Sequence, residues 1–161
     1  MIQIQTKTGN LMNVTAGHIV HGCNAQGVMG SGVALAVKRK FPGAYEGYIN
    51  IHENGGLKLG RAYFEPINSQ LAVWNAITQD GFGSPTRNTS YDAIQTCFQE
   101  INDHIASGLE GIMNMQPNEI HIPLIGAARG GGKWNIIKAI IEETMDYPVT
   151  LWLPDDTVDT K

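Results

Sequence analysis

The amino-acid sequence predicts an α/β protein: a three-layer α/β/α sandwich with a mixed, mostly parallel central sheet. Short apolar runs of strand length alternate with amphipathic helical patterns along nearly the whole chain. With 161 residues, of which 42% are hydrophobic and 16% charged, the chain has the size and composition of one globular domain. We therefore expect a single domain over residues 1–155, followed by a short C-terminal tail at 156–161.

In the first half of the chain, the pattern indicates two strands followed by two helices. The first of these helices places Val33, Val37 and Phe41 on one face, and its last turn carries three cations, which favour a helix C-terminus. Pro42 ends this helix and opens the next one. The expected elements are strands at 2–5 and 18–23, a helix at 31–41, and a helix from 42 to the Asn-Gly-Gly turn at 54–56.

In the second half of the chain, strands and helices alternate again. Two strands are joined by the turn signal Asn68-Ser69, and an amphipathic helix follows with Thr89 or Ser90 as its cap. The expected elements are strands at 61–66, 71–78, 119–125 and 149–153 and helices around 94–105 and 134–145. Sheets of this kind bind their ligands at the carboxyl ends of the parallel strands.

Composition and charge exclude several classes of function. The net charge is −4, so the protein lacks the basic field that sequence-independent binding to phosphate backbones requires, and we expect no direct sequence-specific nucleic-acid binding. The N-terminus lacks the basic and apolar blocks of a signal peptide, and no apolar run has the length of a membrane span, so we expect a cytoplasmic protein. Cys23 and Cys97 form neither a disulfide framework nor a zinc-ligand spacing, and we expect no metal and no cofactor.

Two glycine-rich segments each follow an expected strand and lead into a helix. The first runs from Ala25 to Gly32 and the second from Gly126 to Gly132. Glycine lets the backbone come close to a ligand, and the helix start that follows offers free amides, so both segments suit phosphate oxygens. Glycine also occurs where a strand turns sharply into a helix, but two such loops together favour a phosphate-containing ligand. Neither segment fits a Walker motif or a dinucleotide-binding GxGxxG motif.

The stretch HGCNAQGVMGSGVALAVKRKFP, together with PLIGAARGGGKW before the last helix, resembles the macrodomain family, whose members bind ADP-ribose. The resemblance covers nearly the whole chain and is greatest to the branch with ADP-ribose 1''-phosphate phosphatases, terminal ADP-ribose glycohydrolases and antitoxins that remove ADP-ribose from DNA. It implies that Asn24 holds the distal ribose and that the two glycine-rich segments form the walls of the diphosphate cleft. The ligand-binding residues it implies are Asn10, Gly30, Ser31, Gly32, Val33, Gly126, Ala127, Ala128, Arg129, Gly130, Gly131 and Leu153.

Three positions depart from the family pattern. The family's adenine-binding aspartate corresponds to Asn10, which keeps a side-chain acceptor but not the charge. The lysine that takes part in ADP-ribose release in the glycohydrolases and DNA antitoxins corresponds to Gln79 or Asp80. The glycohydrolases also carry an acidic residue in the second loop, where this chain has glycines and Arg129. The absence of this lysine and of the acidic residue favours a phosphatase over a hydrolase that removes ADP-ribose, or an acyl group, from another molecule.

Under the phosphatase hypothesis, the candidate catalytic residues are His21, Asn24 and Asp80. His21 stands on the strand that leads to Asn24, and a histidine can protonate a departing oxygen or attack phosphorus near neutral pH. The alternative is a core histidine whose ring bonds the backbone. Asp80 can orient His21 or activate water, or it can be an ordinary turn former.

The remaining expectations concern the role of Arg129 and the binding partners. The Arg129 guanidinium group can make a bidentate contact with a terminal phosphate, or it can lie in solvent. The expected partners are ADP-ribose or its 1''-phosphate and ADP-ribosylated macromolecules, with no membrane. A non-catalytic protein that only binds ADP-ribose is the third hypothesis.

Overall fold

The chain folds around one six-stranded sheet with the strand order β1-β6-β5-β2-β4-β3. The computed structural model describes residues 1–108 and 118–155, so the expected tail at 156–161 lies outside the described residues. Only β3 runs antiparallel to its neighbour, and all other paired strands are parallel, as predicted. The strands are β1 (Gln5–Thr8), β2 (Gly17–Asn24), β3 (Ala62–Pro66), β4 (Leu71–Gln79), β5 (Ile120–Ile122) and β6 (Val149–Leu153).

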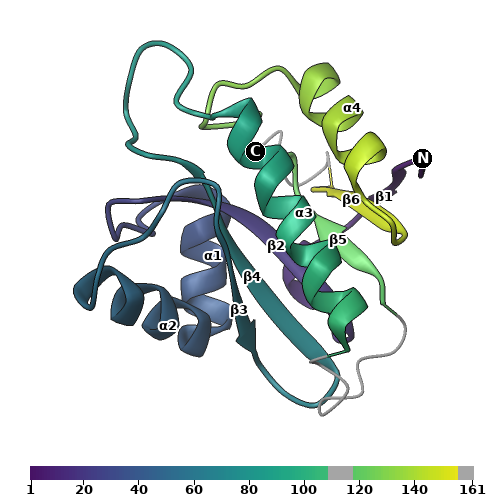
Figure 1. Ribbon diagram of the computed structural model, residues 1–161, viewed down its shortest axis with the longest axis horizontal. Helices are drawn as coiled ribbons and strands as arrows, with labels where there is room; N and C mark the ends of the chain where they lie inside the picture. Colours follow the sequence, from purple (N-terminus) through teal and green to yellow (C-terminus); the bar gives the residue numbers. More distant parts are fainter. Residues whose placement is uncertain (109–117, 156–161) are drawn as a thin grey trace.

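Helices cover both faces of this sheet, which gives the predicted three layers (Figure 1). Helices α1 and α2 pack over one face, and α3 and α4 pack side by side over the other. A short 3-10 helix, η1, follows β1 and leads toward β2. The helices are η1 (Leu11–Asn13), α1 (Gly32–Lys40), α2 (Pro42–Glu53), α3 (Tyr91–Ser107) and α4 (Trp134–Thr144).

Local sequence signals explain where the helices begin and end. Ser90 caps α3, because its hydroxyl accepts a hydrogen bond from the amide of Ala93. Gly108 ends α3 in the left-handed conformation, with φ of 71°. Pro42 takes the first position of α2, where the missing amide proton costs nothing. These signals confirm Ser90, one of the two predicted caps, and the predicted break at Pro42.

The hydrophobic core is divided between the two faces of the sheet. The larger cluster lies under α3 and α4 and includes the fully buried Phe98, Ile101 and Ile137. Two smaller clusters lie under α1 and α2, around Val37 and around Tyr48. The strands that leave this core are therefore held rigidly where their loops begin.

Two predicted strands differ from the structure. The strand expected at 2–5 lies at Gln5–Thr8, because the amides of Ile2 and Ile4 bond to Glu142 near the end of α4 instead of joining the sheet. The strand expected at 119–125 is shortened to Ile120–Ile122, because Pro123 has no amide proton to continue the ladder.

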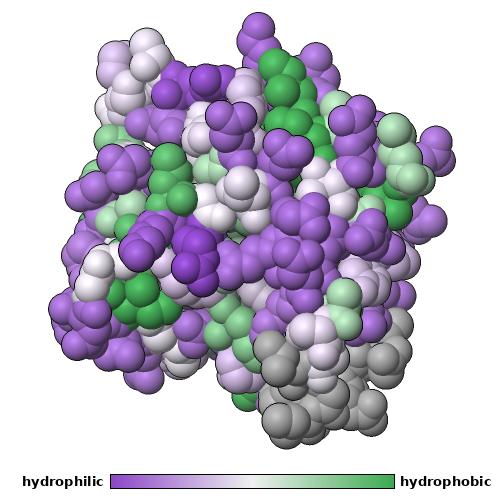
Figure 2. Space-filling model, viewed as in Figure 1, coloured by the Kyte–Doolittle hydropathy of each residue, from purple (hydrophilic) through white to green (hydrophobic). Residues whose placement is uncertain are grey.

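The loops that follow β2, β4 and β5 gather at one end of the molecule, where these parallel strands have their carboxyl ends (Figure 1). The face seen in Figure 2 is mostly hydrophilic, with small separate hydrophobic patches, one of them over the start of α4. None of the helices in the described part of the chain combines the length and apolar character needed to cross a bilayer.

Candidate ligand-binding cleft

The first glycine-rich loop, which links β2 to α1, is organised by the side chain of Asn24. The Asn24 amide nitrogen donates to the carbonyl of Val28 at 2.9 Å, and its oxygen accepts from the amide of Gln26 at 2.9 Å. This oxygen also accepts from the Tyr48 hydroxyl at 2.9 Å. Asn24 therefore shapes the loop in this structure, and its predicted contact with the distal ribose stays a prediction.

Two residues of α2 support this loop from below, and sequence reasoning assigned neither of them to the site. The Tyr48 hydroxyl also donates to the backbone carbonyl of Asn24 at 2.7 Å, and burial raises the pKa of this hydroxyl. The ring of His52 lies against Gly27, where any Cβ would clash with it. The sequence shows only a helical spacing for Tyr48, so nothing in it indicates a contact with Asn24.

The start of α1 supplies an anion-binding surface at the end of the first loop. Ser31 is the N-cap residue with an extended backbone, and its hydroxyl makes no capping bond to the helix. The first amides of an α-helix have no acceptor within the helix, and the helix dipole makes this end positive. Gly30, Ser31, Gly32 and Val33 are all exposed here. The structure therefore places the predicted diphosphate residues of the first loop where backbone amides are available.

The second glycine-rich loop, residues 126–132, is held by the segment between β4 and α3. The Thr89 hydroxyl donates to the carbonyl of Gly126 at 2.8 Å, and the amide of Asn88 donates to the carbonyl of Gly130 at 2.8 Å. A Cβ on Gly130 would clash with the Thr89 hydroxyl. Gly130 must therefore be glycine for the loop to lie this close, while Ala128 and Arg129 remain exposed.

The two loops meet at Arg129 and Gly32. The Arg129 side chain lies over Gly32, with Nε 3.0 Å and Cδ 3.2 Å from the position that a Cβ on Gly32 would take. A guanidinium group thus lies against the positive end of α1, an arrangement that is favourable when an anion lies between them. This juxtaposition brings together the predicted residues of both loops, and we call the candidate site between them the two-loop cleft, after the diphosphate cleft that the resemblance implies.

Asp80 lies at one end of the two-loop cleft, directly after β4. Its backbone carbonyl accepts hydrogen bonds from the amide of Ala25 at 2.9 Å and from the side chain of Gln26 at 3.2 Å. Its own side chain is exposed. The structure thus brings Asp80 next to Asn24, and it offers an acidic group at the predicted ribose end.

His21 does not face the two-loop cleft. Its side chain is 0% exposed, and its Nε2 lies 2.7 Å from the amide oxygen of Asn75 on β4. Burial lowers the pKa of His21 to about 4, so the ring is neutral at physiological pH. Asn75 in turn donates to the carbonyl of Ala44 in α2. These contacts match the alternative of a core histidine, except that the partner is a side-chain amide. We therefore assign His21 no direct contact with a ligand.

The predicted adenine end of the cleft lies at the ends of β1 and β6. The Asn10 oxygen accepts from the amide of Met12 and caps η1, while the side chain itself is exposed. The Leu153 side chain packs against the core under α3 and α4, so only its backbone borders the site, where its carbonyl accepts from Gly9. The aromatic ring of Trp152 lies against Gly9 instead.

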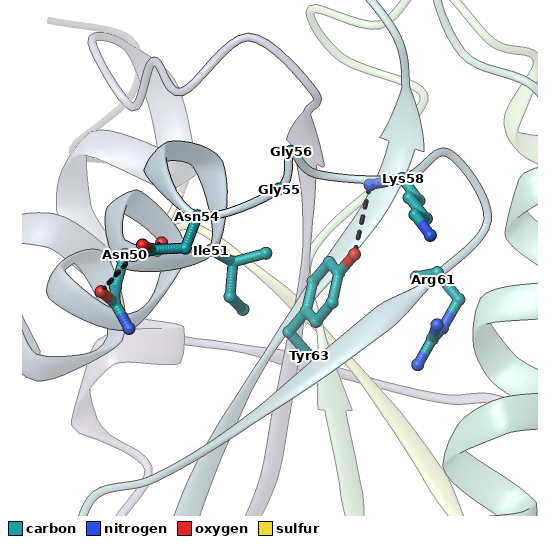
Figure 3. Close-up of a pocket in the computed structure, with 8 residues that line it drawn as sticks. All are labelled: Asn50, Ile51, Asn54, Gly55, Gly56, Lys58, Arg61 and Tyr63. Atoms are coloured by element: carbon teal, nitrogen blue, oxygen red, sulfur yellow. Dashed lines mark hydrogen bonds between the residues drawn. The ribbon is translucent and has the colours of Figure 1, made fainter.

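Two surface hollows lie near the two-loop cleft, one outside it and one beside Asn10 at its predicted adenine end. One of about 340 Å³ lies between the end of α2 and the start of β3 (Figure 3). In it, Tyr63 extends its hydroxyl toward the backbone amide of Lys58, which donates to it at 3.2 Å. The other hollow, of about 410 Å³, lies beside η1 and is lined by Glu119, His121 and Trp152 among others.

The described residues hold no group of three or more histidine, cysteine or acidic side chains that suits a metal ion. Both cysteines are buried and free, and burial raises the pKa of Cys23 well above its ordinary value. Neither thiol has the exposure or the low pKa that a nucleophile needs.

Comparison with known proteins identifies relatives for this architecture. The family model described as "Macro domain" matches residues 20–141. A DNA ADP-ribosyl glycohydrolase from Thermus aquaticus is 28% identical over 86% of this chain, which spans 36% of that relative's length. An ADP-ribose 1''-phosphate phosphatase from Meyerozyma guilliermondii is 26% identical, with 78% of this chain and 82% of the relative covered. The structure of the macrodomain of Thermus aquaticus DarG superposes with a TM-score of 0.76 at 25% identity, covering 94% of this chain and 99% of that one.

Proposed function

Because this chain belongs to the macrodomain family, we propose that it binds ADP-ribose in the two-loop cleft and hydrolyses the bond between the terminal ribose and an attached group. The observation that carries the proposal is the placement of Arg129 against Gly32 at the start of α1. A cation, a helix N-terminus and bare glycine backbone converge there, and a diphosphate is the part of ADP-ribose that this combination recognises.

The remaining parts of the ligand follow from the order of the strands. Asn10 follows β1 at one edge of the sheet, and Asp80 follows β4 on the other side of the cleft. With the diphosphate between the loops, adenine lies toward Asn10, whose amide carries both an acceptor and a donor for the base. The terminal ribose then lies toward Asn24 and Asp80.

For the hydrolytic step we propose Asp80 as the general base. Its carboxylate accepts a proton from a water molecule, whose oxygen forms a bond to the anomeric carbon of the terminal ribose. The bond from this carbon to the attached group breaks, and the leaving group takes the electron pair and afterwards a proton. Arg129 and the loop amides hold the diphosphate in place while this happens, which keeps the anomeric carbon within reach of the water.

The attached group in this proposal is a macromolecule, because the phosphatase hypothesis depended on His21, whose side chain is fully buried. The Thermus aquaticus relative, named as a DNA ADP-ribosyl glycohydrolase, supports this assignment. A second candidate substrate is ADP-ribose 1''-phosphate, which the similarity to the Meyerozyma guilliermondii phosphatase favours. For that substrate, Asp80 rather than the buried His21 would activate the water.

The test is hydrolysis of ADP-ribosylated DNA, ADP-ribosylated protein and ADP-ribose 1''-phosphate by the wild type and by Asp80→Asn. We expect release of ADP-ribose by the wild type, a loss of at least about 100-fold in Asp80→Asn, in line with general-base catalysis, and unchanged ADP-ribose binding. Folded His21→Gln is expected to retain activity. Binding of ADP-ribose with no release from any substrate would instead indicate a protein that only binds the ligand.

A further inference from the structure

The strand order gives the bound ligand a direction, and the inference below rests on the proposed function. From Asn10 beside β1, the ligand crosses the loops after β5 and β2 and ends near Asp80, after β4. Only β3 lies beyond β4 in the sheet. A group attached to the terminal ribose therefore leaves the two-loop cleft toward β3 and the loops beside it.

The hollow in Figure 3 lies on this exit side. The amide of Ile77 in β4 donates to the carbonyl of Arg61 at 2.9 Å, and Ile77 is also paired with Cys23 of β2. Neighbouring strands are about 4.8 Å apart, so Arg61 lies about 10 Å across the sheet from the strand that ends in Asn24. Ile51 and Tyr63 in the wall of the hollow pack against the cluster that also supports the first loop.

The chemistry of this hollow fits an anionic chain with planar groups. Lys58 and Arg61 line it, and none of the residues lining it is acidic. The Arg61 guanidinium is paired with Glu100 at 3.0 Å, which fixes its position, whereas Lys58 is exposed. Gly55 leaves open space beside the backbone, because a Cβ there would meet no atom within 4 Å.

The loop between β4 and α3 adds an exposed aromatic side chain close to the end of β4. Phe82 is 56% exposed and stands two residues after Asp80, whose backbone is bonded to the first loop. In the same loop, the Arg87 guanidinium lies 4.0 Å over the ring of Tyr91. Cations along a groove combined with exposed aromatic rings are the features by which proteins bind single-stranded nucleic acid.

We infer that the α2–β3 hollow and Phe82 bind the single-stranded nucleic acid to which the ADP-ribose is attached. Lys58 contacts a phosphodiester group next to the modified nucleotide, and Phe82 stacks on a neighbouring base. The net charge of −4 makes these contacts weak on their own. They act when the ADP-ribose anchors the strand, because binding of the second group is then intramolecular.

The experiment measures binding by an Asp80→Asn protein, so that hydrolysis does not consume the probe. Its probes are free ADP-ribose, an ADP-ribosylated single-stranded oligonucleotide, the unmodified oligonucleotide and an ADP-ribosylated peptide. We expect the ADP-ribosylated oligonucleotide to bind about tenfold more tightly than ADP-ribose at low salt, an advantage that Lys58→Gln and Phe82→Ser each reduce. Lys58→Gln should also reduce the slope of log K against log salt by about 0.7.

Lys40→Gln is the matched control, because it removes an exposed lysine at the last residue of α1, away from the end where the loops gather. Equal affinity for ADP-ribose and for the modified oligonucleotide would overturn the inference while leaving the proposed function intact. An equal gain with the modified peptide would assign the surface to a protein instead and also overturn it. Absence of ADP-ribose binding would contradict the proposed function itself.

Discussion

The two loops of the cleft are held in place in opposite ways. The first loop is held by Asn24, the residue at its own start, and by Tyr48 of helix α2. The second loop is organised from outside, by Thr89 and Asn88 in a segment about forty residues earlier in the chain. Contacts made by a residue of the loop's own motif can be anticipated from the sequence, whereas contacts made by a distant segment cannot.

This difference also predicts how strongly substitutions affect each loop. The second loop depends on close backbone approach at Gly130, where there is no space for a side chain. The first loop depends on single hydrogen bonds to a side chain, each worth about 1 kcal/mol. Changes to the second loop should therefore be severe, and changes to the support of the first loop should be mild.

The largest effect of a single substitution on ligand binding is expected for Gly130→Ala. The new methyl group would clash with the Thr89 hydroxyl and force the second loop away from its anchor. We expect a loss of ADP-ribose affinity of at least about 100-fold and a decrease in unfolding free energy of about 2 kcal/mol, measured by calorimetric titration and urea unfolding. Gly81→Ala is the control, because a Cβ there meets no atom within 4 Å; similar losses in both variants would contradict the account.

A pH-dependent loss of stability is expected from β2, the strand that leads into the first loop. Burial lowers the pKa of both His18 and His21 to about 4, from 6.5 in the unfolded chain. Between these two values the unfolded state binds more protons, so stability is complete above pH 6.5 and falls as the pH falls toward 4. With about 1.4 kcal/mol for each pKa unit, the unfolding free energy should decrease by several kcal/mol.

Urea unfolding at several pH values measures this dependence. A folded His21→Gln variant should show a weaker dependence, because it lacks one of the two buried histidines. A free energy of unfolding that stays constant from pH 7 to pH 4.5 would show that the two buried histidines are not neutral in the folded protein.

A smaller effect is expected for Arg129→Gln, which removes the cation but leaves the backbone of both loops in place. Hydrogen bonds to charged groups contribute about 1.5–3 kcal/mol, so ADP-ribose affinity should decrease about 10- to 100-fold. Arg39→Gln, an exposed arginine near the far end of α1, should bind as the wild type does. Equal affinities of Arg129→Gln and the wild type would remove Arg129 from the diphosphate site.

The smallest effect is expected for Tyr48→Phe. The variant loses the hydroxyl that donates to Asn24 but keeps the ring in the core, so the unfolding free energy should decrease by about 1 kcal/mol. Tyr45→Phe in the same helix is the control, since the ring that lies 4.3 Å from the Lys38 ammonium is retained. An identical change in both variants would mean that the contact with Asn24 carries no stability.

The elements of the fold could be predicted from the sequence because hydrophobic period and helix signals are local. Ser90, Pro42 and the glycine-rich segments each mark a boundary through their own backbone preferences. The two shifted strands depended on contacts that are not local. Ile2 and Ile4 are apolar and alternate as strand residues do, but their amides donate hydrogen bonds to Glu142, which lies 138 or more residues later in the chain.

The candidate site can be inferred from the sequence where it consists of backbone and glycine, which local motifs indicate, and not where it depends on how strands face one another. His21 and Asn24 are three residues apart on β2, yet one faces the buried interior beneath α2 and the other reaches the loop. The pairing of β2 with β4 also shifts its register between Cys23 and Asn24. The sequence shows neither that irregularity nor the partners Asn75 and Tyr48.

The most direct test of the central claim is an NMR titration of the protein with ADP-ribose, followed through the backbone amides. The account predicts the largest shifts at Gly32, Val33 and the amides of residues 126–131, with smaller ones near Asn10 and Asp80. Shifts centred on Lys58 and Tyr63, or confined to His121 and Trp152 with none at residues 126–131, would place the ligand in one of the two hollows and contradict binding in the two-loop cleft.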